Sequence, residues 1–267
     1  GTWSVQKVRE QLEKKSCSFE RIYFSRGSDF EIYQERKTLG KLLVPTILEA
    51  VNHDVENTVF SYIPNTAEVA FIGMTEEIHK QHIQLKLNAF NKGEIKTTEE
   101  LHEQLSLMPR VEKIAIKDVK MRTFITEDTS RNDLVHHVYD VTYGLVKNNQ
   151  DTLVVLDDSI VRGTTLKESI LTMLDRLQPK KIIVVSSAPQ IRYPDCYGID
   201  MSKMGSFVAF QAAVQLWKER NEYHVLEALY KECKEEIQKP LSEIRNLVKK
   251  VYEPFTADEI SAKIADI

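Results

Sequence analysis

The chain has 267 residues, of which 42% are hydrophobic and 28% are charged, a composition that is typical of a folded globular protein and argues against disorder. Its 36 basic and 40 acidic residues nearly balance, so no overall field favours nucleic acid or an anionic membrane, and a bound anion would need a local site. The three cysteines are too few for a disulfide framework and fit a reducing cytoplasm, and no apolar stretch approaches the roughly 20 residues of a membrane span.

Short β-rich runs recur along the chain, and each precedes a helical pattern. The runs cover residues 19–25, 57–63, 111–117, 151–157 and 180–188. Such alternation predicts an α/β fold with a central, mostly parallel sheet and helices on both faces. The last two runs are nearly continuously apolar, so we expect them in the middle of the sheet.

Two segments of the first 204 residues have clear helical signals. Residues 164–177 carry apolar side chains at helical spacing, which together with the flanking runs predicts a βαβ unit. Residues 88–110 are interpreted as an excursion from the sheet, with Thr97 and Glu100 as a capping box for a short helix.

The pattern of residues 205–267 is helical throughout, and we expect a C-terminal helical appendage packed on a domain formed by residues 1–204. Thr256 and Glu259 form a second capping box. The long charged run in this region predicts a solvated face, and the opposite, buried face is expected to include Trp217, Leu226 and Leu229.

The histidines are not interpreted as metal ligands. His79, His82 and His102 lie on polar helical segments and are expected to be solvated. His136 and His137 are adjacent in sequence, so they cannot share one helix face. We therefore predict no zinc site.

The most informative stretch is "TLVVLDDSIVRGTT", in which a hydrophobic run ends in two adjacent carboxylates. Ligands of parallel sheets bind beyond the carboxyl ends of the strands, which is where Asp157 and Asp158 are expected. Two adjacent carboxylates repel each other unless each has a hydroxyl donor or a cation. The vicinal hydroxyls of a ribose or a hydrated divalent cation would meet that need.

The residues that follow the two acids suit a phosphate. Gly163 allows a tight turn, and the hydroxyls of Ser159, Thr164 and Thr165 gather at the start of a helix, where the dipole favours an anion. Together with the two carboxylates, this segment predicts a ribose 5-phosphate site.

Other kinds of site fit these residues less well. A P-loop requires a lysine after its last glycine, and Gly163 is followed by threonines. A receiver domain also ends its first strand in paired acids, but its phosphate-accepting aspartate follows on a later strand, and the run 180–188 ends without one. A strand end that is acidic by chance would explain one carboxylate better than the whole arrangement.

The motif "VVLDDSIVRGTT" resembles the phosphoribosyl pyrophosphate loop of the type I phosphoribosyltransferases, and "DDSIVRGTT" is similar to the form found in amidophosphoribosyltransferases. A second block, "YPDCYGIDM" at residues 193–201, resembles that family's "PDFYGIDM". Weaker similarity begins near residue 19 and includes "YIPNTAEVA" and "MRTFI".

The resemblance implies a type I phosphoribosyltransferase fold and a defined reaction. Ammonia would attack the anomeric carbon of phosphoribosyl pyrophosphate, and pyrophosphate would leave with Mg²⁺, giving 5-phosphoribosylamine for purine synthesis. The family's partners would be a glutaminase domain that supplies ammonia, purine nucleotides as inhibitors, and further copies in a homo-oligomer, in the cytoplasm.

The resemblance also assigns residues to roles. Asp157, Asp158 and Thr66 would lie on the metal side of the site. Lys117, Lys120 and Arg122 would cover the pyrophosphate as catalytic residues. The ribose and 5-phosphate would be held by Asp157, Asp158, Ser159, Ile160, Val161, Arg162, Gly163, Thr164 and Thr165.

Several positions depart from the family pattern. Asn65 and Ala67 replace an aspartate and a glycine, which removes a charge and a residue that tolerates positive φ. Asp118 lies among Lys117, Lys120 and Arg122, on the segment that closes over the site in the family, and His136 with His137 replaces an arginine pair.

Two alternatives to the transferase therefore stay open: a regulatory module that binds the ligand without turnover, and a salvage enzyme that uses a nucleobase. The N-terminal glutaminase domain is absent from this chain, so the first hypothesis is the transferase half of a longer protein.

Overall fold

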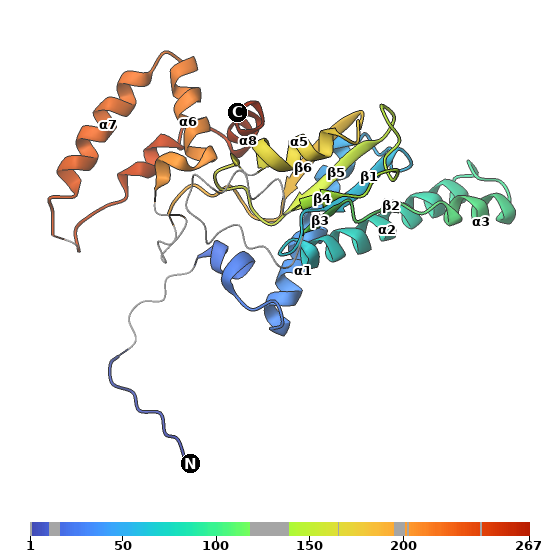
Figure 1. Ribbon diagram of the computed structural model, residues 1–267, viewed down its shortest axis with the longest axis horizontal. Helices are drawn as coiled ribbons and strands as arrows, with labels where there is room; N and C mark the ends of the chain where they lie inside the picture. Colours follow the sequence, from blue (N-terminus) through green and yellow to red (C-terminus); the bar gives the residue numbers. More distant parts are fainter. Residues whose placement is uncertain are drawn as a thin grey trace.

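The computed structural model describes residues 2–10, 17–117, 139–164, 166–194, 201, 203–240 and 242–267. Its core is a parallel sheet of four strands in the order β2-β1-β5-β6 (Figure 1). A smaller antiparallel sheet pairs β3 with β4. The bounds of the strands are β1 Thr58–Tyr62, β2 Arg110–Val111, β3 Ala115–Lys117, β4 Tyr139–Val141, β5 Thr152–Asp157 and β6 Lys181–Ser186.

The position of β5 in the centre of the sheet is confirmed. It pairs with β1 through Tyr62 opposite Leu156 and with β6 through Asp157 opposite Ser186, so three carboxyl ends meet at one edge. The prediction for β6 is wrong: among the described strands it lies at the edge of the sheet and is only half-buried. Its apolar side chains are instead partly covered by helices on the two faces.

One face of the sheet is covered by the helices α1 Phe30–Ala50 and α2 Glu68–Asn91. They cross at two glycines: a Cβ on Gly40 would lie 1.7 Å from the Ala70 carbonyl oxygen, and one on Gly73 would lie 1.9 Å from the Lys37 carbonyl oxygen. The absence of side chains here therefore permits backbone contact between the helices, and brings their apolar residues onto Phe60 of β1.

The other face is covered by η3 Leu166–Leu171 and the short α5 Thr172–Asp175, which continue one another as the predicted βαβ connection. Leu174 is fully buried against Leu153 and Val59. The predicted fold class, a parallel sheet with helices on both faces, is confirmed.

The predicted excursion is helical. The end of α2 and the helix α3 Thr98–Ser106 extend away from the sheet (Figure 1), and both reciprocal hydrogen bonds of the Thr97–Glu100 capping box are present. The prediction that His82 is solvated is wrong, because its side chain is only 6% exposed and lies against the backbone of Leu107 after α3.

The C-terminal region contains η4 Met204–Ser206, α6 Val208–Glu219, α7 Tyr223–Glu236, η5 Leu247–Val251 and α8 Ala257–Asp266. Trp217 and Leu229 are buried in their shared core and Leu226 packs partly buried against it, as predicted. The Trp217 indole nitrogen donates to the Val251 carbonyl at 2.9 Å. The Thr256–Glu259 capping box also forms.

Two strand predictions need correction. Residues 20–24 form a π-helix, η1 Glu20–Phe24, because Phe19 and Ile22 lie on one helical side and pack with Phe207. The run 111–117 is divided between β2 and β3. Between them, the Ile114 amide donates to the Ser61 side chain at 3.1 Å, which redirects the chain away from β1. No described helix is long and apolar enough to cross a bilayer.

Candidate functional site

The two predicted acids lie where β5 ends. The Ser187 amide donates to the Asp157 carbonyl at 2.9 Å, and the Ala188 amide donates to the Asp158 carbonyl at 3.0 Å. The Ser187 hydroxyl adds a bond of 3.1 Å to the same Asp158 carbonyl. The extension of β6 thus holds the backbone of both acids, which limits the directions in which their carboxylates can point.

The electrostatics of the pair favour a ligand that donates hydroxyls or carries positive charge. Burial raises the pKa of Asp157, and the neighbouring charge of Asp158 raises it further. Burial also raises the pKa of Asp158, while hydrogen bonds from the Ser159 amide, Thr66 and the Ser159 hydroxyl oppose that rise. When both carboxylates are ionised they therefore repel each other, and an added hydroxyl donor or cation would relieve that repulsion.

The predicted phosphate loop follows directly. Gly163 has φ +74°, the left-handed conformation that favours glycine. The Val208 amide at the start of α6 donates to the Val161 carbonyl at 2.8 Å, and the Lys167 amide donates to the Gly163 carbonyl at 2.8 Å. The loop is thus joined at one side to α6 and at the other to the helix that follows it.

The amides of this loop are suitable donors for an anion. Within residues 159–164, the amides of Ile160, Gly163 and Thr164 donate to no acceptor in the described part of the chain. They precede η3, so the helix dipole adds to their attraction for negative charge. Thr165 lies outside the described residues.

Thr66 is brought to the site from β1. The Ile63 amide donates to the Leu156 carbonyl at 2.8 Å, which places the turn 64–67 beside the end of β5. Ala67, at the glycine position of the family pattern, has φ −67° and is 1% exposed. The alanine therefore fits this turn, since no positive φ is required there.

Lys117 is brought close to the two acids by β3. Burial lowers the pKa of its ammonium, and the charges of Asp158 and Asp157 oppose this change. Its Nζ lies over the ring of Tyr139, 5.4 Å from the centroid. Burial raises the pKa of Tyr139, with the two acids as further causes.

Tyr139 was missed by the sequence reasoning. Its signal was the alternation of "YDV", which suits a short strand opposite the run 111–117.

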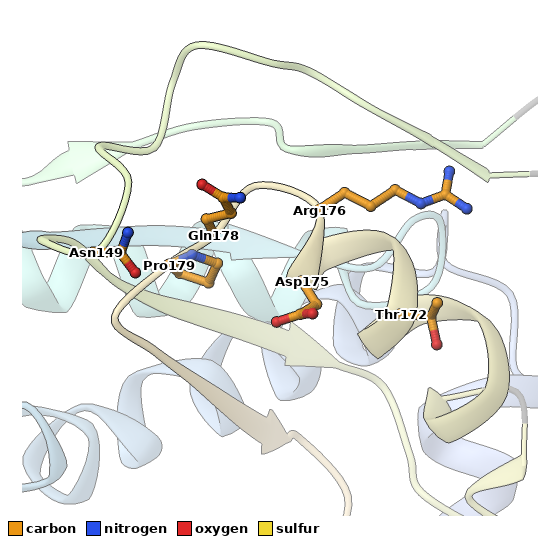
Figure 2. Close-up of a pocket in the computed structure, with 6 residues that line it drawn as sticks. All are labelled: Asn149, Thr172, Asp175, Arg176, Gln178 and Pro179. Carbon is orange, nitrogen blue, oxygen red and sulfur yellow. The ribbon is translucent and has the colours of Figure 1, made fainter.

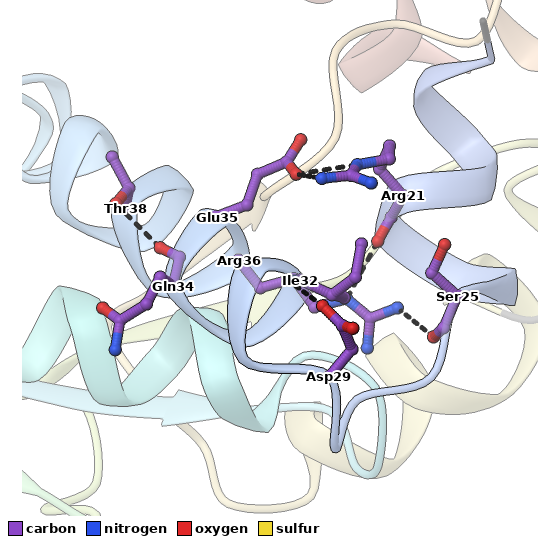
Figure 3. A network of polar contacts seen from close by, with 8 residues as sticks. All are labelled: Arg21, Ser25, Asp29, Ile32, Gln34, Glu35, Arg36 and Thr38. Carbon is purple, nitrogen blue, oxygen red and sulfur yellow. Dashed lines mark hydrogen bonds and ion pairs between the residues drawn. The ribbon is translucent and has the colours of Figure 1, made fainter.

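Arg36 is a second residue that sequence reasoning missed. It is 7% exposed on α1, and its guanidinium donates to the carbonyls of Arg21 at 3.1 Å and Ser25 at 2.9 Å (Figure 3). Burial lowers its pKa, which the charge of Asp158 opposes. Arg21 in turn binds Glu35 at 2.8 Å, so this network fixes η1 against α1 beside the site.

Several predicted positions lie outside the described residues: Lys120, Arg122, Asp118, His136, His137 and most of the block 193–201. Among the described residues, no group of three or more His, Cys, Asp or Glu side chains forms a metal cluster.

Two hollows differ in their relation to the site. A groove of about 1310 Å³ borders Gly163 and Thr164 and runs along β6 between α1 and α8. A smaller hollow of about 580 Å³, lined by residues such as Asn149 and Asp175 (Figure 2), lies at the amino ends of β5 and β6. Because parallel sheets bind ligands at the opposite end, the smaller hollow is not a candidate.

Comparison with known proteins identifies amidophosphoribosyltransferases among the relatives of this chain. No family model matches the chain. It is 27% identical over 211 residues to an amidophosphoribosyltransferase of Haemophilus influenzae, covering 77% of this chain and 36% of the relative. It is 28% identical over 210 residues to the amidophosphoribosyltransferase of Bacillus subtilis, covering 76% and 36%.

A solved structure of glutamine phosphoribosylpyrophosphate amidotransferase from B. subtilis, complexed with ADP and GMP, is 29% identical over 74% of this chain and 36% of that one, with a TM-score of 0.47. The chain spans little more than a third of the length of the curated relatives it matches. As the motif predicted, the chain is similar to the amidophosphoribosyltransferases over about three quarters of its own length.

Proposed function

We propose that this chain carries the phosphoribosyltransferase site of an amidophosphoribosyltransferase. It would transfer ammonia to phosphoribosyl pyrophosphate and produce 5-phosphoribosylamine and pyrophosphate for purine synthesis. The observation that carries the proposal is the pair Asp157 and Asp158 at the end of the central strand, followed by the left-handed turn at Gly163. The similarity to enzymes of that name supports it.

The two halves of the site would hold the two halves of a ribose 5-phosphate. The carboxylates of Asp157 and Asp158 would accept hydrogen bonds from the vicinal ribose hydroxyls. The loop 159–165, including Arg162, would donate amide and hydroxyl groups to the 5-phosphate at the start of η3. Since strand and helix backbones hold both halves, the anomeric carbon would be kept in a defined place for attack.

The transfer itself forms one bond and breaks one. The lone pair of ammonia forms the bond to the anomeric carbon, while the bond from that carbon to the pyrophosphate oxygen breaks and its electrons leave with pyrophosphate. The new ammonium then loses a proton to water. Positive charges from Lys117, Lys120 and Arg122 would stabilise the leaving group.

The acidic pair also fits Mg²⁺. This ion binds through one or two carboxylates together with substrate phosphates, and it retains several waters. Asp157 and Asp158, whose pKa values are raised by burial, are carboxylates that a cation would stabilise, and Thr66 lies beside them. When bound, the ion would neutralise charge on the leaving pyrophosphate.

The remaining partners belong to the same proposal. Ammonia would come from a glutaminase domain, purine nucleotides would inhibit, and the enzyme would be a cytoplasmic homo-oligomer. The aligned part makes up little more than a third of the relatives, which leaves room in them for a further domain, and the three scattered cysteines fit a reducing compartment. Sedimentation of the full-length protein would test the oligomeric state.

Pyrophosphate release with phosphoribosyl pyrophosphate, Mg²⁺ and ammonium tests the central claim. We expect turnover in the full-length protein and its loss, together with ligand binding, in Asp158→Asn. Asp175→Asn, at the exposed opposite end of the sheet, is the control and should leave both unchanged. Binding without turnover would instead support the regulatory module, and undiminished binding in Asp158→Asn would mean that the site is misassigned.

A further inference from the structure

We infer that Tyr139 is a positioning residue, which keeps the Lys117 ammonium over its ring and away from the two acids, so that the lysine stays available for the pyrophosphate end of the substrate. The inference rests on the proposed function, and deepens it by adding a residue that the family pattern did not indicate.

The register of the small sheet places the two side chains together. Ala115 pairs with Val141, and both are buried in the core under β1 and β5. Two residues further along, Lys117 pairs with Tyr139 on the same face. Because alternate residues of a strand share a face, the lysine and tyrosine emerge from that core at the carboxyl end of the main sheet, beside the acids.

The contact between the two residues has the geometry of a cation–π interaction. The Lys117 Nζ lies 5.4 Å from the centroid of the Tyr139 ring, within the roughly 6 Å over which such attraction acts. Both groups are partly removed from water, which strengthens the attraction. The ring itself packs against the core that contains Val141, so its position is set by the fold.

The ring also joins the small sheet to the metal side of the site. The Tyr139 hydroxyl lies 3.5 Å from the Pro64 carbonyl oxygen, at the long limit of a hydrogen bond. Pro64 begins the turn that carries Thr66. Tyr139 thus contacts both the lysine and the turn, although it need not touch the substrate.

Lys117 lies near the two acids without forming an ion pair with either of them. The charges of Asp157 and Asp158 act on the lysine, yet within the described residues it forms no ion pair at 4.0 Å or less with either carboxylate. A lysine that bound these carboxylates would compete with the ribose hydroxyls and with Mg²⁺. Holding its ammonium on an aromatic face leaves the acids free for those ligands.

Substitutions that keep the volume of the ring test the inference. Tyr139→Met fills the space but lacks the π face, whereas Tyr139→Phe keeps the face and loses only the hydroxyl. Lys117→Met removes the charge. Tyr143→Leu, on a neighbouring side chain that is 62% exposed, is the control.

In the ammonia-dependent assay of the full-length protein, we expect Tyr139→Met to raise the KM for phosphoribosyl pyrophosphate about tenfold, and Tyr139→Phe to stay within about threefold of wild type. Tyr139→Met combined with Lys117→Met should be no worse than Lys117→Met alone, because the two residues act as one unit. Binding of ribose 5-phosphate, which has no pyrophosphate, should change less than about twofold.

The outcomes separate this inference from the proposed function. Wild-type protein that neither binds ribose 5-phosphate nor releases pyrophosphate would remove the proposed function itself. An active wild type with Tyr139→Met indistinguishable from it would overturn the inference alone. An equal rise of the KM in Tyr139→Met and Tyr139→Phe would also overturn it, since both variants would then act through the lost hydroxyl. Additive effects of Tyr139→Met and Lys117→Met would overturn it as well, since the two residues would then act independently.

Discussion

Replacing Gly40 by alanine perturbs the closest contact between the two helices that cover one face of the sheet. A Cβ at this position would lie 1.7 Å from the Ala70 carbonyl oxygen, whereas non-bonded heavy atoms prefer about 3.5 Å. The obstacle is a backbone atom, so it cannot rotate out of the way. The helices would have to separate by roughly 1.8 Å to restore that distance.

The expected cost follows from two opposing effects. Overpacking of a core costs about 1–3 kcal/mol, and a clash with backbone belongs at the upper end, near 3 kcal/mol. Alanine has a better helix propensity than glycine by about 1 kcal/mol, so we expect a net loss of about 2 kcal/mol. For a domain of this size, that corresponds to a melting temperature lower by roughly 4–8 °C.

Thermal and urea unfolding of the full chain measure this loss. Gly205→Ala is the matched control, because a Cβ there would meet nothing within 4 Å, and it should stay within about 0.5 kcal/mol of wild type. Gly73→Ala opens the same crossing, so the double variant should cost less than the sum of the two. A Gly40→Ala protein as stable as wild type, or more stable, would show that the helices do not cross so closely.

Three further outcomes are expected. Gly163→Ala should weaken ribose 5-phosphate binding by about 1–2 kcal/mol in calorimetry, because φ is +74° there, and Gly163→Asn should weaken it less. Equal affinities of the alanine and asparagine variants would remove the conformational explanation. Asp151→Asn should lower the free energy of unfolding in urea by about 3 kcal/mol, because Arg110 lies 2.8 Å from the fully buried Asp151 and would keep only its bond to the Leu145 carbonyl after losing this charged partner. A change below about 0.5 kcal/mol would contradict this. Burial lowers the pKa of His82, so the folded state resists its protonation, and the free energy of unfolding should fall as the pH drops through about 6.5 and below. If His82→Gln loses the same stability over this pH range, other groups cause the loss.

The candidate site was predictable where its chemistry is local. Asp157, Asp158 and Gly163 are consecutive or nearly so, and their order alone indicates a carboxylate pair followed by a tight turn at a strand end. The capping boxes at Thr97 and Thr256 formed as predicted for the same reason, since their hydrogen bonds span three residues. Patterns of this length depend little on the rest of the fold.

Other features depended on contacts between distant segments. Tyr139 lies 22 positions from Lys117 in the numbering, and only strand pairing places the two on one face. The helical spacing of residues 20–24 was indistinguishable from a strand in so short a run, until packing with Phe207 decided it. His82 has polar neighbours in the sequence, which predicted an exposed side chain, but the segment after α3 covers it.

The sequence by itself therefore determined the carboxylate pair and the tight turn of the candidate site, the parallel α/β class and two helix starts, because each follows from side chains within a few residues of one another. The tertiary structure alone decided that β6 lies at the edge of the described sheet, that Gly40 and Gly73 meet backbone, and that Tyr139 and Arg36 lie beside the acids. These facts depend on which surfaces the folded chain buries against each other, and burial is a property of the whole fold.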